Sequence, residues 1–272
     1  MREQDLVSDF TAVDQARSPQ SFTTWLDRAS AMEFFGSVKR QTYGLLELQA
    51  GGAVLDVGCG TGDDVRALGQ LVGEGGRAVG VDVSETLITE ARRRAGGSSL
   101  PVEFHQGDAL CLPFPDASFD ACRSERTLIY LEDPAPALGE MMRVARPGAR
   151  IVVFEPDLDA LMIDGSDRTL TRAIVAHFCR GFPNSQTGRQ LPGLFRQAQV
   201  VDVAITPVTL VVRDYDVADE FFKLRATVER AQADAAVSVT DAEGWLGEME
   251  QRGRDGRFFV ASPAFVVSGR KG

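Results

Sequence analysis

The sequence predicts an α/β fold in which helices cover both faces of a parallel sheet. Between residues 53 and 154, short apolar runs of strand length alternate with amphipathic stretches of helix length. Parallel strands in that rhythm need crossover helices, which lie on both sides of the sheet. The chain has 272 residues, 44% of them hydrophobic and 25% charged, which are ordinary globular values and exclude a disordered or fibrous protein.

The elements can be placed in order along the chain. Short apolar runs predict strands at 53–57, 77–83, 102–106, 119–123 and 151–154. Apolar stripes at helical spacing predict helices at 34–48 and 63–72, a third capped by Ser84, and a fourth opened by Pro134 and Pro136 and closed by Pro147-Gly148. After Glu155 the alternation ends. We expect helices at 169–180 and 190–199, a long strand at 200–212, a helical region at 215–251 and a terminal strand at 257–269.

This order predicts three parts. Residues 1–50 form an amino-terminal helical lid segment, 51–157 form a Rossmann-like core, and 158–272 supply the rest of the sheet with a helical substrate cap. The chain is long enough for one large domain or for one domain with an added cap.

Charge and composition narrow the classes of partner. The net charge of −10, from 39 acidic and 29 basic residues, argues against a nucleic-acid partner, which usually needs a basic face. No apolar run is long enough for membrane insertion, and the first ten residues lack the pattern of a secretory signal. The four cysteines have no CxxC spacing, so we expect neither disulfides nor a metal site. A cytoplasmic protein with a small-molecule substrate is predicted, with homo-oligomerisation left open.

The most informative segment is VLDVGCGTGDD, residues 54–64. A strand that enters a glycine-rich turn and then a helix is typical of nucleotide binding, because glycines let a ligand approach the backbone. No GK[ST] follows, and Asp63 stands where a dinucleotide fingerprint has its third glycine. Together with Asp56 and Asp64 it would repel a diphosphate at this helix N-terminus. Capping is an alternative role for Asp64, but a capping acid still repels phosphate.

Two further acids follow the next strands. Asp82 ends the second predicted strand, where a carboxylate can accept both ribose hydroxyls. Asp108 follows the third, where it could accept from an adenine amino group, with the Ala109 backbone beside it. Each could be a solvated turn residue when taken alone. Around one glycine turn, the acids favour a cationic nucleoside such as S-adenosylmethionine.

The sequence resembles the class I S-adenosylmethionine-dependent methyltransferases, in particular the group of ubiquinone/menaquinone-biosynthesis C-methyltransferases and related natural-product methyltransferases. The matching motifs are VLDVGCGTGDD (54–64), VGVDVS (79–84), VEFHQGDALCLPFPDASFDA (102–121) and EMMRVARPGARIVVFEPD (140–157). The resemblance implies a seven-stranded, mostly parallel sheet of order 3-2-1-4-5-7-6 and a cofactor-binding core at 51–157. Two positions depart from the group: Tyr130 replaces a common histidine, and Ala149 ends the usual Pro-Gly-Gly.

The resemblance also implies a set of cofactor-binding residues at the ends of the first four strands. The methionine side is implied to contact Asp56, Gly58, Cys59, Gly60 and Thr61, with Arg123 and Ser124 nearby. Ribose and adenine are implied to contact Asp82, Val83, Asp108 and Ala109.

Methyl transfer needs mainly an in-line nucleophile and a dry site, with a base where a hydroxyl must lose its proton. Our first choice for that base is His177, with packing in the core as the alternative. Tyr130 is the second candidate, to polarise a substrate oxygen; His105 is expected to be structural. Arg189 could contact an acidic substrate group or end a helix, and Arg40 could reach the cofactor carboxylate.

Aromatic side chains could roof an apolar substrate cavity or merely pack the cap. They are Phe34, Phe35, Tyr43, Phe221, Phe222 and Trp245. The leading hypothesis is methyl transfer to a carbon or oxygen of a small, largely apolar molecule of aromatic, quinone or polyketide-like kind, in specialised metabolism. The alternatives are an enzyme of the same fold that catalyses cyclisation or rearrangement, and a non-catalytic module that binds the cofactor.

Overall fold

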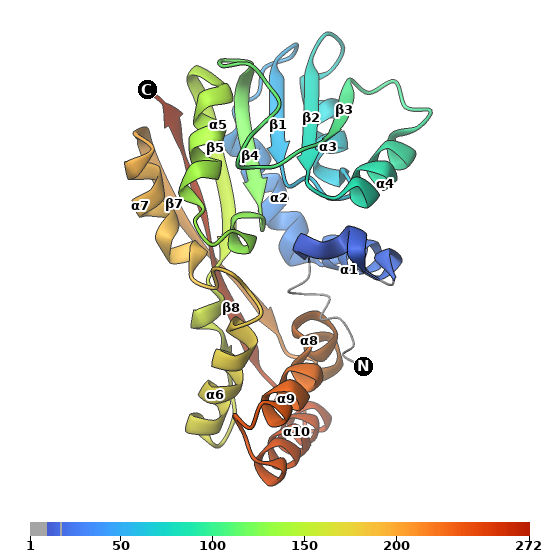
Figure 1. Ribbon diagram of the computed structural model, residues 1–272, viewed down its shortest axis with the longest axis vertical. Helices are drawn as coiled ribbons and strands as arrows, with labels where there is room; N and C mark the ends of the chain where they lie inside the picture. The colour runs from blue at the N-terminus through green and yellow to red at the C-terminus, as the bar shows by residue number, and fades with distance from the viewer. Residues whose placement is uncertain (1–9, 17) are drawn as a thin grey trace.

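The computed structural model describes residues 10–16 and 18–272. An upper lobe built on a twisted sheet stands above a lower lobe of helices (Figure 1). The expectation about an amino-terminal signal concerns residues 1–10, of which 1–9 lie outside the described residues. No described helix is long and apolar enough to cross a membrane.

The sheet confirms the predicted fold class. Its parallel strands are β1 (Ala53–Val57), β2 (Arg77–Asp82), β3 (Val102–Gln106), β4 (Phe119–Glu125) and β5 (Ala145–Pro156). The order is β3-β2-β1-β4-β5-β8, in which β8 (Val260–Lys271) runs antiparallel and β7 (Val200–Val212) pairs with the far side of β8. This is the predicted order, apart from one added strand.

The added strand is β6 (Met162–Ile163), which pairs with Val260 and Ala261 of β8. Because β5 pairs with β8 only over 264–270, the lower end of β8 is left open on that side, and β6 occupies it. The sheet therefore has eight strands rather than seven.

Both faces of the sheet are covered, as side-chain alternation requires. Leu55 and Val57 of β1 pack toward α5 (Ala135–Val144) and α7 (Thr187–Gln197). Val54 packs on the opposite face, which carries α2 (Glu33–Leu45), α3 (Asp63–Val72) and α4 (Glu85–Ala95). Ser84 caps α4 as predicted: its hydroxyl accepts from the Leu87 amide at 3.2 Å.

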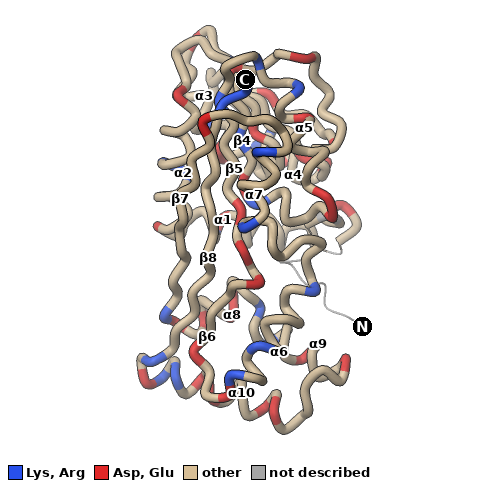
Figure 2. Tube along the Cα trace, turned by 90° about the vertical axis from the view of Figure 1, so that its left-hand side faces the viewer, with Lys and Arg blue, Asp and Glu red and all other residues tan. Residues whose placement is uncertain are grey.

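The lower lobe is built around the ends of β7 and β8, which run down from the upper lobe as a long ribbon (Figure 2). Its helices are α6 (Arg168–Cys179), α8 (Tyr215–Phe222), α9 (Leu224–Ala233) and α10 (Val239–Arg254). The predicted helical region at 215–251 is thus three helices. The first break is at Lys223, whose φ of +52° no helix can continue through.

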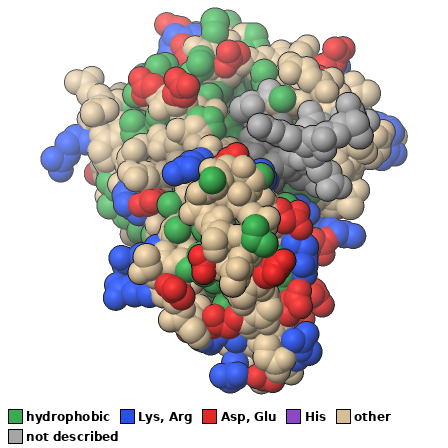
Figure 3. Space-filling view, turned by 60° about the horizontal axis from the view of Figure 1, so that its bottom comes forward, with side chains coloured by type: hydrophobic (Ala, Val, Ile, Leu, Met, Phe, Trp, Pro, Cys, Tyr) green, Lys and Arg blue, Asp and Glu red, His purple; other side chains and the backbone are tan. Residues whose placement is uncertain are grey.

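The amino-terminal segment lies between the lobes. The 3₁₀ helix η1 (Phe10–Gln15) and α1 (Pro19–Ala31) cover the carboxyl ends of the strands. Asp14 accepts hydrogen bonds from the Glu85 and Thr86 amides at 2.9 and 3.1 Å, which docks this segment on the N-terminus of α4. Seen from below, acidic and basic side chains are interspersed over the lower lobe (Figure 3).

Several predicted boundaries differ from the structure by a few residues, and the largest difference is at the start of β5. Pro147-Gly148 was expected to close a helix, but α5 ends at Val144 and β5 begins at Ala145. Ala145 pairs with Phe119 of β4 ahead of an irregularity in the ladder, so strand pairing outweighs the local turn preference of Pro-Gly.

Candidate functional site

A cavity of about 350 Å³ lies between the carboxyl ends of the strands and the lower lobe. Its upper end is lined at the ends of β1, β2 and β3 by Gly58, Gly60, Asp82 and Asp108, with apolar side chains such as Val81 among them. Its lower end is lined by apolar side chains, namely Phe154, Pro156, Leu158, Phe178, Phe182, Leu210, Phe221 and Phe222. The cavity therefore has one polar and one apolar end.

The glycine turn after β1 needs its glycines at two positions in particular. Gly58 has φ +76°, and a Cβ there would lie 2.0 Å from Thr127 Oγ1. Gly62 has φ +75°, and a Cβ there would lie 2.4 Å from the Phe104 ring. Only glycine fits both the backbone angle and the space, so the turn approaches the cavity with bare backbone.

Asp82 is held at the mouth of this turn. Its two carboxylate oxygens accept from the Gly60 amide at 2.9 Å and from the Ser84 amide at 3.0 Å. Burial raises the pKa of Asp82, and the backbone donors oppose that shift. Each oxygen keeps a second lone pair, so this carboxylate, which lines the cavity, can accept from a vicinal diol.

The third strand contributes the expected acid as well. Asp108 lines the cavity and accepts from the Leu110 amide at 2.9 Å, which fixes the turn that follows β3. Ala109 and Val83 line the same wall, and Val83 is exposed. A planar base between these two apolar side chains would have the Asp108 carboxylate at its edge.

Two of the predicted cofactor contacts, Asp56 and Arg123, face each other in the interior behind the cavity wall. The Arg123 guanidinium is 1% exposed and donates to Asp56 at 2.9 Å, and it also bonds to Glu125. Burial raises the pKa of Asp56 to about 7, although Arg123 opposes this shift. The two side chains are therefore paired with each other in the interior.

The same buried cluster reaches the lid. Asp64 pairs with Lys39 of α2 at 2.5 Å and accepts a hydrogen bond from Tyr43. Burial alone would raise the pKa of Asp64, but Arg123 and Lys39 lower it below its ordinary value on balance. Asp64 thus ties α2 to the first turn of α3, beyond the capping role that its position suggested.

Three more predicted contacts have buried side chains: Ser124, Cys59 and Thr61. The Ser124 hydroxyl donates to the Val57 carbonyl at 3.0 Å. Cys59 packs closely on Gly80: a Cβ added at Gly80 would lie 2.6 Å from the Cys59 sulfur. Burial raises the pKa of the Cys59 thiol. Thr61 is 3% exposed. None of the three side chains lines the cavity.

His177 does not face the cavity, which differs from its expected role as a base. It lies in the last turn of α6, and its Nε2 is 3.7 Å from Asp234 at the end of α9. Burial lowers the pKa of its ring. The cavity is lined instead by Phe178 and Phe182 of the same segment, so His177 belongs to the packing of the lower lobe.

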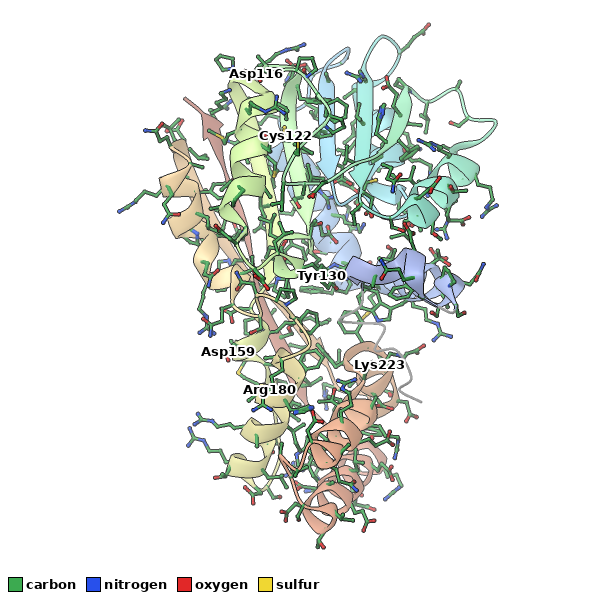
Figure 4. The ribbon with its side chains drawn as sticks, in the orientation of Figure 1. Asp116, Cys122, Tyr130, Asp159, Arg180 and Lys223 are labelled. Atoms are coloured by element: carbon green, nitrogen blue, oxygen red, sulfur yellow. The ribbon has the colours of Figure 1, made fainter. Side chains whose placement is uncertain are left out.

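Tyr130 does line the cavity, at the junction of the two lobes (Figure 4). Its ring centroid lies 5.8 Å from that of Phe10 and 6.0 Å from that of Phe182. His105 lies beside Glu103 on β3, with its ring against Phe114.

The two other basic candidates are paired with acids: Arg40 on the surface, and Arg189 with the buried carboxylate of Asp157. Arg40 donates to Glu33 at 2.6 Å and is mostly exposed. Arg189 holds Asp157 and lies 3.2 Å from Asp159.

Four of the six predicted roof aromatics line the cavity: Phe34, Phe35, Phe221 and Phe222. Tyr43 bonds to Asp64 instead. Trp245 is buried in the cap, where its indole donates to Thr171 at 3.0 Å.

Three residues that line the cavity were not predicted from the sequence: Glu125, Arg126 and Trp25. The signal for the first two was their place, since they directly follow the strand that ends with Arg123 and Ser124. Trp25 stacks on Phe221 at 5.1 Å, a contact between distant segments that spacing could not reveal. Within the described residues, no three or more His, Cys, Asp or Glu side chains form a metal site, and all four cysteines are free.

Comparison with known sequences locates the similarity. A family described as methyltransferase domain matches residues 55–153. An uncharacterized 37.1 kDa protein in transposon TN4556 of Streptomyces fradiae is 36% identical over 246 residues, which are 90% of this chain and 70% of that protein. The demethylmenaquinone methyltransferase of Shouchella clausii is 38% identical over 120 residues, which are 44% of this chain. The chain covers 51% of that relative's length.

Solved structures share the fold. The YcgJ protein of Bacillus subtilis superposes with a TM-score of 0.60 at 19% identity, covering 88% of this chain and 98% of that one. The [4+2]-cyclase SpnF superposes with a TM-score of 0.54 at 24% identity, covering 86% and 80%. At these identities the likeness concerns the fold alone.

Proposed function

Because the chain belongs to the class I S-adenosylmethionine-dependent methyltransferases, we propose that it transfers a methyl group to a carbon or oxygen of a small, largely apolar molecule. The observation that carries the proposal is the two-ended cavity, polar at the glycine turn and apolar toward the lower lobe. Aromatic, quinone and polyketide-like acceptors suit the apolar end. We also propose a cytoplasmic location, and a role in specialised metabolism because the sequence resembles natural-product methyltransferases.

The residues at the polar end fit S-adenosylmethionine. Gly58 and Gly60 line the cavity without side chains, so their backbone can contact its methionine side, and Asp82 has lone pairs for its ribose hydroxyls. Asp108 and Ala109 line the part of the cavity proposed for the adenine. When bound, this cofactor supplies a methyl group on a positively charged sulfur, a charge that acidic lining attracts.

The remaining work falls to the chain itself. The acceptor must be held in line, about 3 Å from the methyl carbon, with water excluded. The stacked pair of Trp25 from α1 and Phe221 from α8 closes one side, and Phe35 packs on Phe221 at 5.7 Å. These contacts join the lid to the cap over the cavity. We assign the rings an orienting and water-excluding role.

The quinone relatives support an aromatic acceptor. The Shouchella clausii protein is a demethylmenaquinone methyltransferase, and its similarity covers under half of this chain. The lower lobe, which lines the acceptor end, falls largely outside the matched family segment of 55–153. We therefore propose a bulky, ring-containing acceptor without assigning the menaquinone precursor itself.

Binding of S-adenosylhomocysteine, measured by calorimetry, tests the cofactor site. Asp82→Ala should weaken it by roughly 1–3 kcal/mol, because the ribose hydroxyls lose their buried acceptor. Asp116→Ala, at an exposed acid far from the cavity, is the matched control and should bind as the wild type does. Equal affinity in all three proteins would remove Asp82 from the site.

Cyclisation without methyl transfer is the second candidate, favoured by the similar fold of the [4+2]-cyclase SpnF. Incubation with methyl-labelled cofactor and a panel of phenols, quinols and polyketides separates the candidates. Label in a product supports methyl transfer. A rearranged product without demethylated cofactor supports cyclisation, and tight cofactor binding without turnover would support a binding module.

A further inference from the structure

Glu125 and Arg126, at the carboxyl end of β4, line the cavity with buried atoms that have no hydrogen-bond partner among the described residues. The atoms are Glu125 Oε1 and Arg126 Nε, and they lie 3.5 Å apart without the geometry of a hydrogen bond. Buried polar atoms are nearly always paired in native proteins. The two atoms thus form an ion pair with each other but no hydrogen bond, so each keeps hydrogen-bonding capacity for a third group.

Both side chains are fixed from behind. The other oxygen of Glu125 bonds to Arg123, which also pairs with Asp56 and lies 3.4 Å from Asp64. This buried cluster leaves Oε1 as the oxygen of Glu125 that accepts no hydrogen bond.

The Arg126 guanidinium is fixed by rings of the lid. Its central carbon lies 4.4 Å from the Phe35 ring centroid and 5.4 Å from that of Trp25. The Trp25 indole N–H is itself buried without a partner among the described residues, so it offers a second donor to the same region.

The chemistry of the two atoms defines what fits between them. A carboxylate oxygen only accepts hydrogen bonds, and a guanidinium N–H only donates. A hydroxyl group does both, whereas a ketone cannot donate and an ammonium group cannot accept. We propose that Glu125 and Arg126 bind an ionisable hydroxyl group of the methyl acceptor, phenolic or enolic, an inference that rests on the proposed function.

The place of the pair is right for the reacting end of an acceptor. Thr127 follows directly and packs against Gly58 of the glycine turn. Ile129 and Tyr130, two and three residues after Thr127, line the cavity toward its apolar end. A hydroxyl between Glu125 and Arg126 thus stands between the polar and the apolar end of the cavity.

The pair also supplies a proton path. The hydroxyl O–H bond breaks, its proton passes to Glu125 Oε1, and the bonding electrons stay on the acceptor oxygen. Arg126 then pairs with the resulting oxyanion. This raises the electron density of the oxygen and of the ring carbons beside it, and either is a better nucleophile than in the neutral acceptor. Glu125 becomes the catalytic base in place of His177.

Titration of 4-nitrophenol bound to the protein with S-adenosylhomocysteine tests the inference, because its neutral and ionised forms have different absorption spectra. Arg126→Gln should lower the ionisation constant of the bound phenol about tenfold, and Glu125→Gln should raise it about tenfold. Arg126→Lys, which keeps the charge, should restore most of the wild-type value. The opposite signs distinguish the proposed contacts from a general loss of structure.

The matched controls are Arg77→Gln and Glu103→Gln, from an Arg–Glu pair at 2.9 Å on the surface of β2 and β3. Both should leave the titration unchanged. An ionisation constant that is the same in the Glu125 and Arg126 variants as in wild type would overturn the inference. So would a failure of 4-nitrophenol to bind wild-type protein.

A second measurement separates this site from the cofactor site. If Arg126 held the amino-acid end of the cofactor, Arg126→Gln would weaken S-adenosylhomocysteine at least about tenfold and leave 5′-methylthioadenosine, which lacks that end, unchanged. That result overturns the inference. It is supported if Arg126→Gln binds each of the two ligands with the same affinity as the wild type does. Wild-type protein that binds neither ligand contradicts the proposed function instead.

Discussion

The two ends of the cavity differ in how the chain builds them. The polar end comes from the ends of three adjacent strands, within residues 57–110. The apolar end gathers side chains from β5, α6, β7, α8 and β8, between Phe154 and Ala264. The first is local in sequence and rests on backbone geometry, whereas the second depends on how distant elements pack. A sequence motif can therefore identify the residues of the cofactor end but not those of the acceptor end.

The largest expected effect tests whether the buried charges behind the polar end hold it together. Arg123→Met should lower the free energy of unfolding by about 3–5 kcal/mol, because Asp56 would lose its ion-pair partner and Glu125 would keep only the contact with Arg126 at 3.5 Å. Urea denaturation measures it. The control is Arg146→Met, whose pair with Asp120 at 2.5 Å is about half exposed and should cost under about 1 kcal/mol.

If Arg123→Met were as stable as the control, the cluster would be dispensable for folding. The carried-over role of Arg123 as a contact near the methionine would then regain support, since a residue not needed for stability could be kept for the ligand. The comparison of the two arginines decides between these roles.

The sequence predicted the core of the fold well because its signals there are local. The strands at 53–57, 102–106 and 200–212 and the helix at 63–72 have the bounds that periodicity and glycine placement indicated. The start of β5 was missed because Ala145 pairs with β4, a contact that Pro147-Gly148 does not reveal.

The site was predicted in part for the same reason. Asp82 and Asp108 could be found because parallel strands end at one edge of a sheet, which a sequence reveals. Arg123 was predicted to lie near the cofactor because it is at the end of a strand. Side chains alternate between the two faces along β4, however, and Arg123 is on the face that points into the interior. His177 could not be placed, because the face of α6 that meets the cavity depends on how the lower lobe packs.

The next effect concerns Glu155, which joins the two ends. Its Oε1 accepts from the Thr127 and Leu128 amides at 2.8 and 2.7 Å, and burial raises its pKa to about 8. The native state therefore holds a proton that the unfolded state loses near pH 4. Stability from Glu155 is full below about pH 4 and is lost as the pH rises to about 8.

Urea denaturation at pH 5 and pH 8 should show the wild type losing stability relative to Glu155→Gln over that interval. Glu33→Gln, at a carboxyl group that is 84% exposed, should follow the wild type. The same pH dependence in the Glu155 variant as in the wild type would mean that this carboxyl ionises normally in the folded protein.

A comparison of two glycines separates the stability cost of a steric clash from the cost of a left-handed backbone angle. Gly51 and Gly58 have φ of +81° and +76°, but nothing lies within 4 Å of a Cβ at Gly51, whereas Thr127 blocks one at Gly58. Gly51→Ala should cost about 1–2 kcal/mol of stability from its angle alone. Gly58→Ala should cost a further ~1–3 kcal/mol from the clash and also weaken S-adenosylhomocysteine in calorimetry. Equal costs would mean that Thr127 moves aside freely.

The smallest effect is expected at His177, and it bears most directly on the acceptor end. Its ring faces Asp234 and not the cavity, so His177→Ala should lower stability by only ~1 kcal/mol and leave turnover of any accepted substrate unchanged. Tyr130→Phe is the paired variant, since that ring does line the cavity. Steady-state kinetics with methyl-labelled cofactor compares them. A loss of turnover confined to His177→Ala would place the acceptor below Phe178, deeper in the lower lobe than the cavity described above, and would restore the histidine as the base.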